Sequence, residues 1–454
     1  MKIIFDNDAT IVDYHKFIEK YAIPYFRRKY GMEVVNINSL EIEDVFDMKN
    51  TLIKKGYSQK DAEIESKRII EKFWVGFRYI IYSLPGMFYK DAAKTLKKLK
   101  KQGHRIEIHS SRLKADNRGL IGKLTRALMY LQYWLNGCFI SCKCFYCYQD
   151  DTLKAEGVIK RYPDIVFEDK PEMCEQLITE KIKCVCVSGK HNREVREGKY
   201  VKRLNSYKWI EVEETITSLI GTKKWNLYKE IAKSDVFYKR VLFIRQGIKK
   251  SFKPIVLNAN RLKKIEDRGV IYASNHRSTL DPIIITAIIN EPIRYAALAR
   301  FFRGEDSIFN NSKNILLRKI TAFGFKKLKF FSVERIRDDV NANNNNSIKE
   351  MIECSNIKCK IGIFPEGTTL KNTENDFGEF NDSFIRLAAL TNAIIQPITI
   401  YWFTHKGKRK CIVNFGSQLE VRKDNMNEVF SIFMKCQQEQ LQENRNKASE
   451  YTMR

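Results

Sequence analysis

The sequence lacks any long, uninterrupted apolar run. No stretch reaches the roughly 18 residues that a membrane-spanning helix needs, and the nearest candidates are interrupted, one by Arg78 and the other by Gln132 and Asn136. We therefore predict no spanning helix. If the protein acts on a lipid, we expect it to lie on the membrane surface instead of crossing it.

Acidic residues are scarce relative to basic ones. The 454 residues include 81 Lys and Arg against 54 Asp and Glu, which gives a formal net charge of +27 and a pI near 9.5. Such an excess predicts an anionic partner, which is nucleic acid, an anionic membrane surface or a phosphorylated substrate. No signature of a nucleic-acid-binding module is present, so we favour membrane and phosphate and expect no nucleic acid partner.

We also expect no secretory signal. The chain opens Met-Lys-Ile-Ile, and its eleven cysteines are odd in number and unevenly spaced. We therefore expect reduced thiols in the cytosol. The spacing of Cys138, Cys142, Cys144 and Cys147 is not the two-pair pattern of a zinc finger or ribbon. Aromatic and apolar residues between them favour a buried strand over a zinc site.

The stretch from Tyr272 to Asp281 organises the second half of the chain. An apolar run over 269–273 predicts a buried strand that leads into a polar turn containing His276. Asp281 and the following proline open an apolar stretch that predicts a helix. One interpretation makes Asp281 a helix cap and His276 a turn residue. The other makes the two side chains partners in a site.

Two further apolar runs end on polar residues. Residues 361–364 lead into Pro-Glu-Gly-Thr, with Glu366, Gly367 and Thr368. Another run ends on Arg335.

This ordered set resembles the glycerol-phosphate acyltransferase superfamily, and most closely the lysophosphatidic acid acyltransferases. Asn-His-Arg-Ser-x-x-Asp-Pro at 275–282 matches the first family block, and Phe-Pro-Glu-Gly-Thr at 364–368 matches the third. The run ending on Arg335 and Ile-x-Pro-Ile at 395–398 are looser matches to the second and fourth. The resemblance covers about 228–415.

The chemistry of these residues agrees with the resemblance. Acyl transfer from a thioester to an alcohol needs a base for the hydroxyl proton, and histidine is suited to that role near neutral pH. A carboxylate orients such a base, so His276 and Asp281 fit as base and partner. Arg335 offers a fixed cationic fork for an acceptor phosphate. The resemblance implies that Glu366, Gly367 and Thr368 shape the acceptor pocket.

The first half of the chain has its own motifs. A predicted strand over 2–5 leads into Asp-Asn-Asp-Ala-Thr, with Asp6 and Asp8 two residues apart. A second predicted strand over 105–108 ends near Ser110, and a third ends at Glu168 and Asp169, preceded along the chain by Lys154.

This set resembles the haloacid dehalogenase superfamily, in its deoxyribonucleotidase-type branch, over about residues 1–200. The resemblance implies a Mg²⁺-dependent phosphatase, and it assigns six residues. They are Asp6 (nucleophile and metal ligand), Asp8 (acid/base and metal ligand), Ser110 (phosphate ligand), Lys154 (charge neutraliser), and Glu168 and Asp169 (metal ligands). Lys160 is an alternative to Lys154. Another interpretation is a relic whose paired carboxylates only cap a strand.

We thus predict two α/β domains. The first is a Rossmann-like phosphatase domain over 1–205 with a helical cap at about 12–82. After a linker over 206–227, the second is a glycerolipid acyltransferase domain over 228–454. A basic stretch from Phe237 is either an interfacial helix or a core-packing helix with basic ends. The polar, Gln-rich tail predicts a surface helix.

The function predicted first is acylation of 1-acyl-glycerol-3-phosphate by acyl-coenzyme A or acyl carrier protein, in the cytoplasm at the inner face of the membrane. The lysophospholipid and the acyl thioester are then the substrates, and an anionic membrane surface is the partner. Two alternatives stay open. One is acyl transfer to another lipid or an amino-acid acceptor, and the other is a membrane-associated lipid-binding protein with idle sites.

Overall fold

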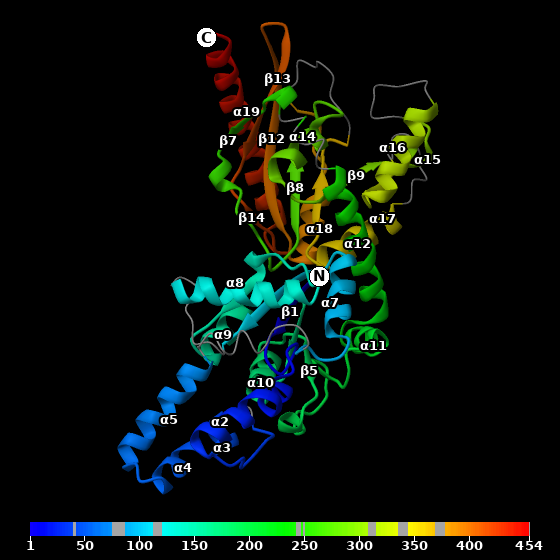
Figure 1. Ribbon diagram of the computed structural model, residues 1–454. Helices are drawn as coiled ribbons and strands as arrows, with labels where there is room; N and C mark the ends of the chain where they lie inside the picture. The colour runs from blue at the N-terminus through cyan, green and yellow to red at the C-terminus, as the bar shows by residue number, and fades with distance from the viewer. Residues whose placement is uncertain are drawn as a thin grey trace. The chain divides into compact units, whose positions relative to one another are not determined.

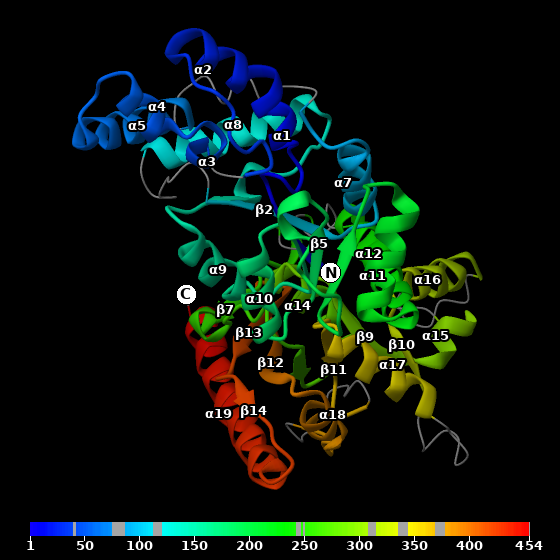
Figure 2. The same ribbon diagram turned by 90° about the horizontal axis from the view of Figure 1, so that it is seen from below.

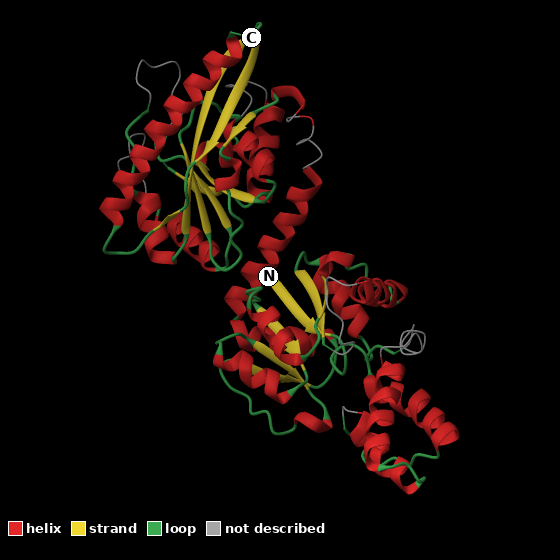
Figure 3. Ribbon diagram, turned by 90° about the vertical axis from the view of Figure 1, so that its left-hand side faces the viewer, coloured by secondary structure: helices red, strands yellow, loops and turns green. Residues whose placement is uncertain are grey.

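The chain divides into two units, unit 1 (Met1–Lys229) and unit 2 (Glu230–Arg454). The computed structural model describes residues 1–39, 42–74, 87–111, 120–241, 247, 250–306, 315–334, 344–367 and 377–453. Each unit has one sheet with helices on both sides (Figure 3). The predicted α/β class is confirmed.

Unit 1 is built on a six-stranded parallel sheet, sheet 1, in the order β3-β2-β1-β4-β5-β6. Its strands are β1 (Lys2–Asp6), β2 (Arg105–Ser110), β3 (Phe145–Cys147), β4 (Ile165–Glu168), β5 (Cys184–Val187) and β6 (Val201–Leu204). Ile3 and Phe5 face one core, and Ile4 faces the other. Both faces of β1 are therefore covered, which explains its continuous apolar sequence.

The helices of unit 1 fall into two groups. Beyond the sheet lie the short helices of the predicted cap, which Figures 1 and 2 show gathered together. They are α1 (Tyr14–Phe17), α2 (Ile23–Tyr30), α3 (Ile42–Phe46), α4 (Met48–Lys54) and α5 (Gln59–Trp74). The others are α7 (Ala92–Lys101), α8 (Leu120–Leu135), α9 (Asp151–Ile159), α10 (Pro171–Thr179), α11 (Trp209–Ile220) and α12 (Thr222–Val241).

The segment 206–227, which we expected to be a linker, is mostly helical and forms part of unit 1. Val212, Ile216 and Leu219 on α11 belong to the main core of that unit. Their spacing of four and three residues places them on one helix face, and this explains why the segment packs instead of linking. The boundary between the units falls inside α12.

Unit 2 contains a larger mixed sheet, sheet 2, in the order β10-β9-β11-β8-β12-β13-β7, with β14 paired to β12. Its strands are β7 (Ile255–Leu257), β8 (Val270–Ser274), β9 (Ile293–Leu298), β10 (Phe331–Val333), β11 (Lys360–Ile363), β12 (Ile394–His405), β13 (Lys408–Phe415) and β14 (Leu419–Glu420). Strands β10, β9, β11, β8 and β12 run parallel. Their carboxyl ends therefore meet at one edge.

Unit 2 contains the second part of α12, from Glu230, and six further helices with described bounds. They are α14 (Asp281–Ile289), α15 (Ala299–Arg303), α16 (Ile315–Lys327), α17 (Asn345–Asn356), α18 (Ser383–Thr391) and α19 (Met426–Thr452). None of the described helices of the chain combines the length and apolar character needed to cross a bilayer. The stretch predicted as interfacial or core-packing lies partly outside the described residues, at 242–246 and 248–249.

The Gln-rich tail is a helix with an exposed outer face, as we predicted, and its inner face is buried. It forms the second half of α19, which runs beside β12 and β13 (Figure 1). Gln437 and Gln440 are buried and accept hydrogen bonds from Thr399 Oγ1 at 2.9 and 3.1 Å. Their amide groups satisfy polar atoms of the sheet, so a polar sequence can pack against it.

Candidate functional site

In unit 2, the turn after β8 carries the histidine. Strand β8 is buried between β11 and β12 and presents this turn at the carboxyl edge of sheet 2. Asn275 fixes the turn to β12, because its Oδ1 accepts from Ile400 N at 2.7 Å and its Nδ2 donates to Ile400 O at 3.0 Å. Asn275 is fully buried. The position of the next residue is therefore set by the sheet.

His276 and Asp281 lie in direct contact. The imidazole Nδ1 lies 3.0 Å from Oδ2 of Asp281, which is the first residue of α14. The same oxygen accepts backbone N–H bonds from Arg277 at 2.6 Å and Ser278 at 2.7 Å. Asp281 is fully buried, whereas the His276 side chain is 17% exposed. With its Nδ1–H donating to the carboxylate, the imidazole keeps Nε2 as its basic nitrogen.

Two aromatic residues support this pair. Trp402 of β12 donates from its indole Nε1 to Oδ1 of Asp281 at 2.8 Å. The ring of Phe364 stacks on the imidazole with 4.2 Å between centroids, and the ring of Tyr295 stacks with Phe364 at 5.7 Å. Both oxygens of Asp281 and one face of His276 are thereby occupied, which restricts the rotation of each side chain.

The other predicted acceptor-site residues are only partly described. Glu366 Oε2 accepts a hydrogen bond from the backbone N–H of His276 at 3.3 Å, and Glu366 Oε1 accepts one from the backbone N–H of Gly378 at 3.4 Å. Burial raises the pKa of the Glu366 carboxyl. Gly367 has φ of 64°, a backbone conformation that glycine adopts readily. Arg335 and Thr368 lie outside the described residues.

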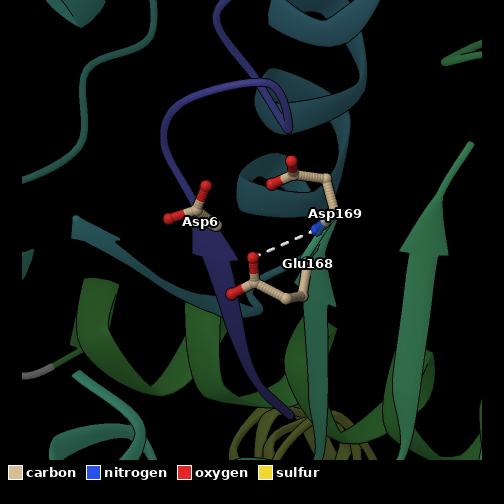
Figure 4. Close-up of side chains that lie close together, drawn as sticks. All are labelled: Asp6, Glu168 and Asp169. Carbon is tan, nitrogen blue, oxygen red and sulfur yellow. Dashed lines mark hydrogen bonds between the residues drawn. The ribbon is translucent and has the colours of Figure 1, made fainter. Parts of the chain in front are cut away.

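In unit 1, three carboxylates gather at the ends of two adjacent strands. Asp6 ends β1, while Glu168 and Asp169 come from the end of β4 (Figure 4). One oxygen from each lies within 4.8 Å of the others, and all three residues are buried. Asp169 N donates to Glu168 Oε1 at 3.1 Å. Parallel pairing of β1 with β4 brings these groups to one edge.

A buried lysine lies against this carboxylate group. Lys154 of α9 donates from Nζ to Asp6 Oδ1 at 2.5 Å and to Glu168 Oε2 at 2.8 Å. Lys160, the alternative, is exposed and bonds to Glu156. Burial and the neighbouring carboxylates raise the pKa of Asp6, although Lys154 opposes the shift. The single ammonium of Lys154 balances only one of the three carboxylates, so the group keeps an excess of negative charge.

The carboxylates suit a hard cation. Mg²⁺ prefers oxygen ligands, and three carboxylates beside a single ammonium, which together carry a formal charge of −2, match that preference. Asp8 is outside the three-residue group, although we predicted it as a ligand. Its Oδ2 instead accepts from Ser110 Oγ at 3.2 Å. The structure therefore brings Asp8 and Ser110 together beside the group.

Several supporting residues were not assigned from the sequence. Asp169 Oδ1 accepts from Thr10 Oγ1 at 3.0 Å, and its Oδ2 lies 3.0 Å from His191 Nε2. Thr10 is the last residue of the Asp-x-Asp-x-Thr motif that begins at Asp6, and this position in the motif was a signal that it belongs to the site. Trp402 gave no such signal, because it lies 121 residues beyond Asp281.

The fold and site of unit 2 define a class of protein, namely an α/β protein with a His–Asp pair suited to base-assisted group transfer. A comparison with family models then gives the class a name. Residues 256–401 match the family model Acyltransferase. Unit 2 therefore contains an acyltransferase domain, as the sequence predicted.

Comparison with curated proteins finds no match. Among solved structures, the chain is similar to the 1-acyl-sn-glycerophosphate (LPA) acyltransferase PlsC from Thermotoga maritima, at 15% identity and a TM-score of 0.32, over 51% of this chain and 92% of that one. It is also similar to a beta-phosphoglucomutase from Clostridium difficile, at 17% identity and a TM-score of 0.32, over 48% of this chain and 98% of that one. At these values, neither likeness bears on function.

Proposed function

We propose that unit 2 transfers an acyl group from a thioester of coenzyme A or acyl carrier protein to the free hydroxyl of 1-acyl-glycerol-3-phosphate, giving phosphatidate. The observation that carries the proposal is the contact between His276 Nδ1 and Asp281 Oδ2, inside the segment that matches the acyltransferase family. The formal charge of +27 suits a phosphate-bearing acceptor on an anionic membrane surface.

The proposed steps use one base and no covalent enzyme intermediate. Nε2 of His276 takes the acceptor's hydroxyl proton while the oxygen attacks the thioester carbonyl carbon. The tetrahedral intermediate expels the thiolate, and the imidazolium returns its proton to the sulfur. Asp281 holds the tautomer and stabilises the imidazolium. The rigid support from Trp402 and Phe364 keeps the base in place through both proton transfers.

The acceptor phosphate is assigned to Arg335, as the resemblance implies. Replacing this guanidinium with alanine removes a bond to a charged group, worth about 1.5–3 kcal/mol. We expect Arg335→Ala to raise the acceptor's KM much more than the donor's. Equal increases in both KM values would assign Arg335 to another role.

An acceptor panel tests the substrate. The full chain is incubated with labelled acyl-coenzyme A and, separately, with lysophosphatidate, a monoacylglycerol and a free amino acid. We expect transfer to lysophosphatidate at least tenfold faster than to the monoacylglycerol, which lacks the phosphate. Faster transfer to the amino acid would replace the glycerolipid assignment, and no transfer to any acceptor would favour an idle lipid-binding site.

We also propose that unit 1 hydrolyses a small phosphomonoester in a Mg²⁺-dependent reaction. The three buried carboxylates with Lys154 among them support this second activity. Asp6 attacks the phosphorus, Asp8 protonates the leaving oxygen, and water then hydrolyses the aspartyl phosphate with Asp8 as base. Ser110 and Lys154 bind the transferred phosphoryl group. A Mg²⁺ ion held by Asp6, Glu168 and Asp169 would neutralise charge on the phosphate.

The helical cap favours a soluble substrate, because the chains of a lipid must stay in the membrane while its headgroup enters the site. We expect phosphate release from small phosphomonoesters to require Mg²⁺ and to be lost in Asp6→Asn. Robust release from phosphatidate vesicles, abolished by the same substitution, would make the protein a two-step lipid enzyme instead.

A further inference from the structure

Helix α16 in unit 2 exposes apolar side chains along one side. Ile315, Leu316, Ile320 and Phe323 are 60%, 63%, 52% and 55% exposed. At 3.6 residues per turn, these positions fall within an arc of about 140°. Thr321, on the opposite side of the helix, is buried. Ala322 is buried as well, and Phe325 packs against Phe301 and Phe330. The helix therefore carries apolar side chains on its outer side as well as its inner side, whereas the outer side of a helix that faces water is polar.

The same arc carries only positive charge. Lys319, Lys326 and Lys327 are exposed on it, and the helix contains no acidic residue. None of these lysines has an ion pair within the described part of the chain, although Lys327 lies over the Phe323 ring at 5.5 Å. By contrast, Arg303 on the neighbouring α15 is paired with acidic side chains. The charges of these three lysines can therefore interact with an anion outside the protein.

Helix α16 lies near the edge from which His276 is presented. Helix α15 begins directly after β9, and α15 packs against α16. Strand β9 pairs with β11, and β11 pairs with β8, the strand that precedes His276. Figure 1 shows α14, α15 and α16 toward the same end of sheet 2. A surface on α16 therefore lies on the side of unit 2 where an acceptor would enter.

We propose that the exposed face of α16 is the docking surface of unit 2 on an anionic lipid membrane. Its four apolar side chains enter the boundary between headgroups and acyl chains, and its three lysines extend to the lipid phosphates. This inference rests on the proposed function, because a lipid acceptor requires contact with the membrane that holds it. A second copy of the chain is a poorer occupant, since lysines would face lysines in a protein of charge +27.

Vesicle co-sedimentation of the full chain tests the proposal, using phosphatidylcholine vesicles with and without 30% phosphatidylglycerol. In the apolar variant Leu316→Gln/Ile320→Gln, we expect the partition coefficient to fall about tenfold or more on both vesicle types. In the lysine variant Lys319→Gln/Lys326→Gln/Lys327→Gln, we expect a similar fall on the anionic vesicles alone. A matched control, Leu390→Gln/Ile432→Gln, removes apolar residues that are 60% and 45% exposed on α18 and α19. It should bind as the unmodified protein does.

Unchanged binding of the apolar variant, with its melting temperature preserved, would overturn the proposal. A wild-type dimer that the apolar variant converts to monomer would also overturn it, because a second copy would then cover the face. The acyl-transfer assay is scored separately. Loss of binding in both α16 variants supports the docking surface even if the unmodified protein transfers no acyl group, and that result would reject the proposed function alone.

Discussion

The indole of Trp402 donates a hydrogen bond from Nε1 to Oδ1 of Asp281, 2.8 Å away. Asp281 Oδ2 is already bonded to the imidazole of His276 and to two backbone N–H groups. Trp402 therefore occupies the carboxylate oxygen that the His276 turn leaves open. The bond holds the plane of the carboxylate, and through it the direction in which the imidazole points.

We predict that Trp402→Phe lowers kcat about tenfold with little change in KM, because it removes one hydrogen bond to a charged group while keeping an aromatic ring. Steady-state kinetics with varied acceptor measures this. Phe252→Leu is the control, since Phe252 packs edge-on against Trp402 at 5.8 Å. An equal loss in both variants would mean that Trp402 acts through packing and not through its N–H.

Gly362 should be intolerant of any side chain. A Cβ placed there would lie 2.2 Å from the ring of Tyr295, which stacks on Phe364 against His276. We expect Gly362→Ala to destabilise unit 2 by about 1–3 kcal/mol and to lower acyl transfer, because the displaced ring disturbs the stack. Gly324→Ala on α16 has no atom within 4 Å of its Cβ, so it should leave acyl transfer unchanged and stabilise the helix by up to about 1 kcal/mol. Equal effects of the two substitutions would contradict this account.

A buried histidine in unit 1 should make folding sensitive to acid. His104 stacks on Trp225 at 5.1 Å, and neither ring nitrogen has a hydrogen-bond partner among the described residues. Burial lowers the pKa of His104 from 6.5 to about 3. Between these values the unfolded chain binds the proton and the folded chain does not. Stability is therefore complete above pH 6.5 and falls as the pH drops toward 3, by about 2 kcal/mol at pH 5.

The substitution His104→Phe keeps an aromatic ring at this position and removes the group that binds the proton. We expect denaturant unfolding of His104→Phe to depend less steeply on pH between 4 and 6.5. His109, whose pKa burial lowers to about 4, still contributes to the remaining slope. The same slope in variant and wild type would show that His104 is protonated in the folded protein.

Magnesium should stabilise unit 1. Binding to the folded state alone adds RT ln(1 + [L]/Kd), about 2.7 kcal/mol at a hundredfold excess over Kd. We expect Mg²⁺ to raise the melting temperature, EDTA to reverse the rise, and Asp6→Asn or Glu168→Gln to abolish it. Glu156→Gln removes an exposed carboxylate on α9 and should keep the shift. A shift that survives in Asp6→Asn would assign the ion to another place.

Local sequence patterns predicted the parts of the fold that depend on neighbouring residues. The apolar runs before Asp6, Glu168 and His276 form buried strands β1, β4 and β8, since a strand buried on both faces needs apolar side chains in succession. Parallel pairing then brings the residues after these strands to one edge of each sheet. The positions of Asp6, Glu168 and His276 could therefore be inferred before the structure was known.

Contacts between distant segments could not be inferred in this way. Trp402 reaches Asp281 only because β12 pairs with β8. Helix α19 has a polar sequence, and its packing depends on Gln440, whose amide donates to Asn414 O at 2.9 Å. Such bonds need the sheet to be in place first, and neither residue shows a pattern in its own segment.

The most direct test of the central claim is acyl transfer by His276→Ala. Labelled acyl-coenzyme A and lysophosphatidate are incubated with the full chain, and labelled phosphatidate is measured alongside Mg²⁺-dependent phosphate release from a small phosphomonoester. Because general base catalysis contributes about 10²–10⁴-fold, we predict that His276→Ala loses acyl transfer to that extent and keeps phosphate release. Asp6→Asn should do the opposite. Acyl transfer at a near-normal rate in His276→Ala would contradict the assignment of His276 as the base.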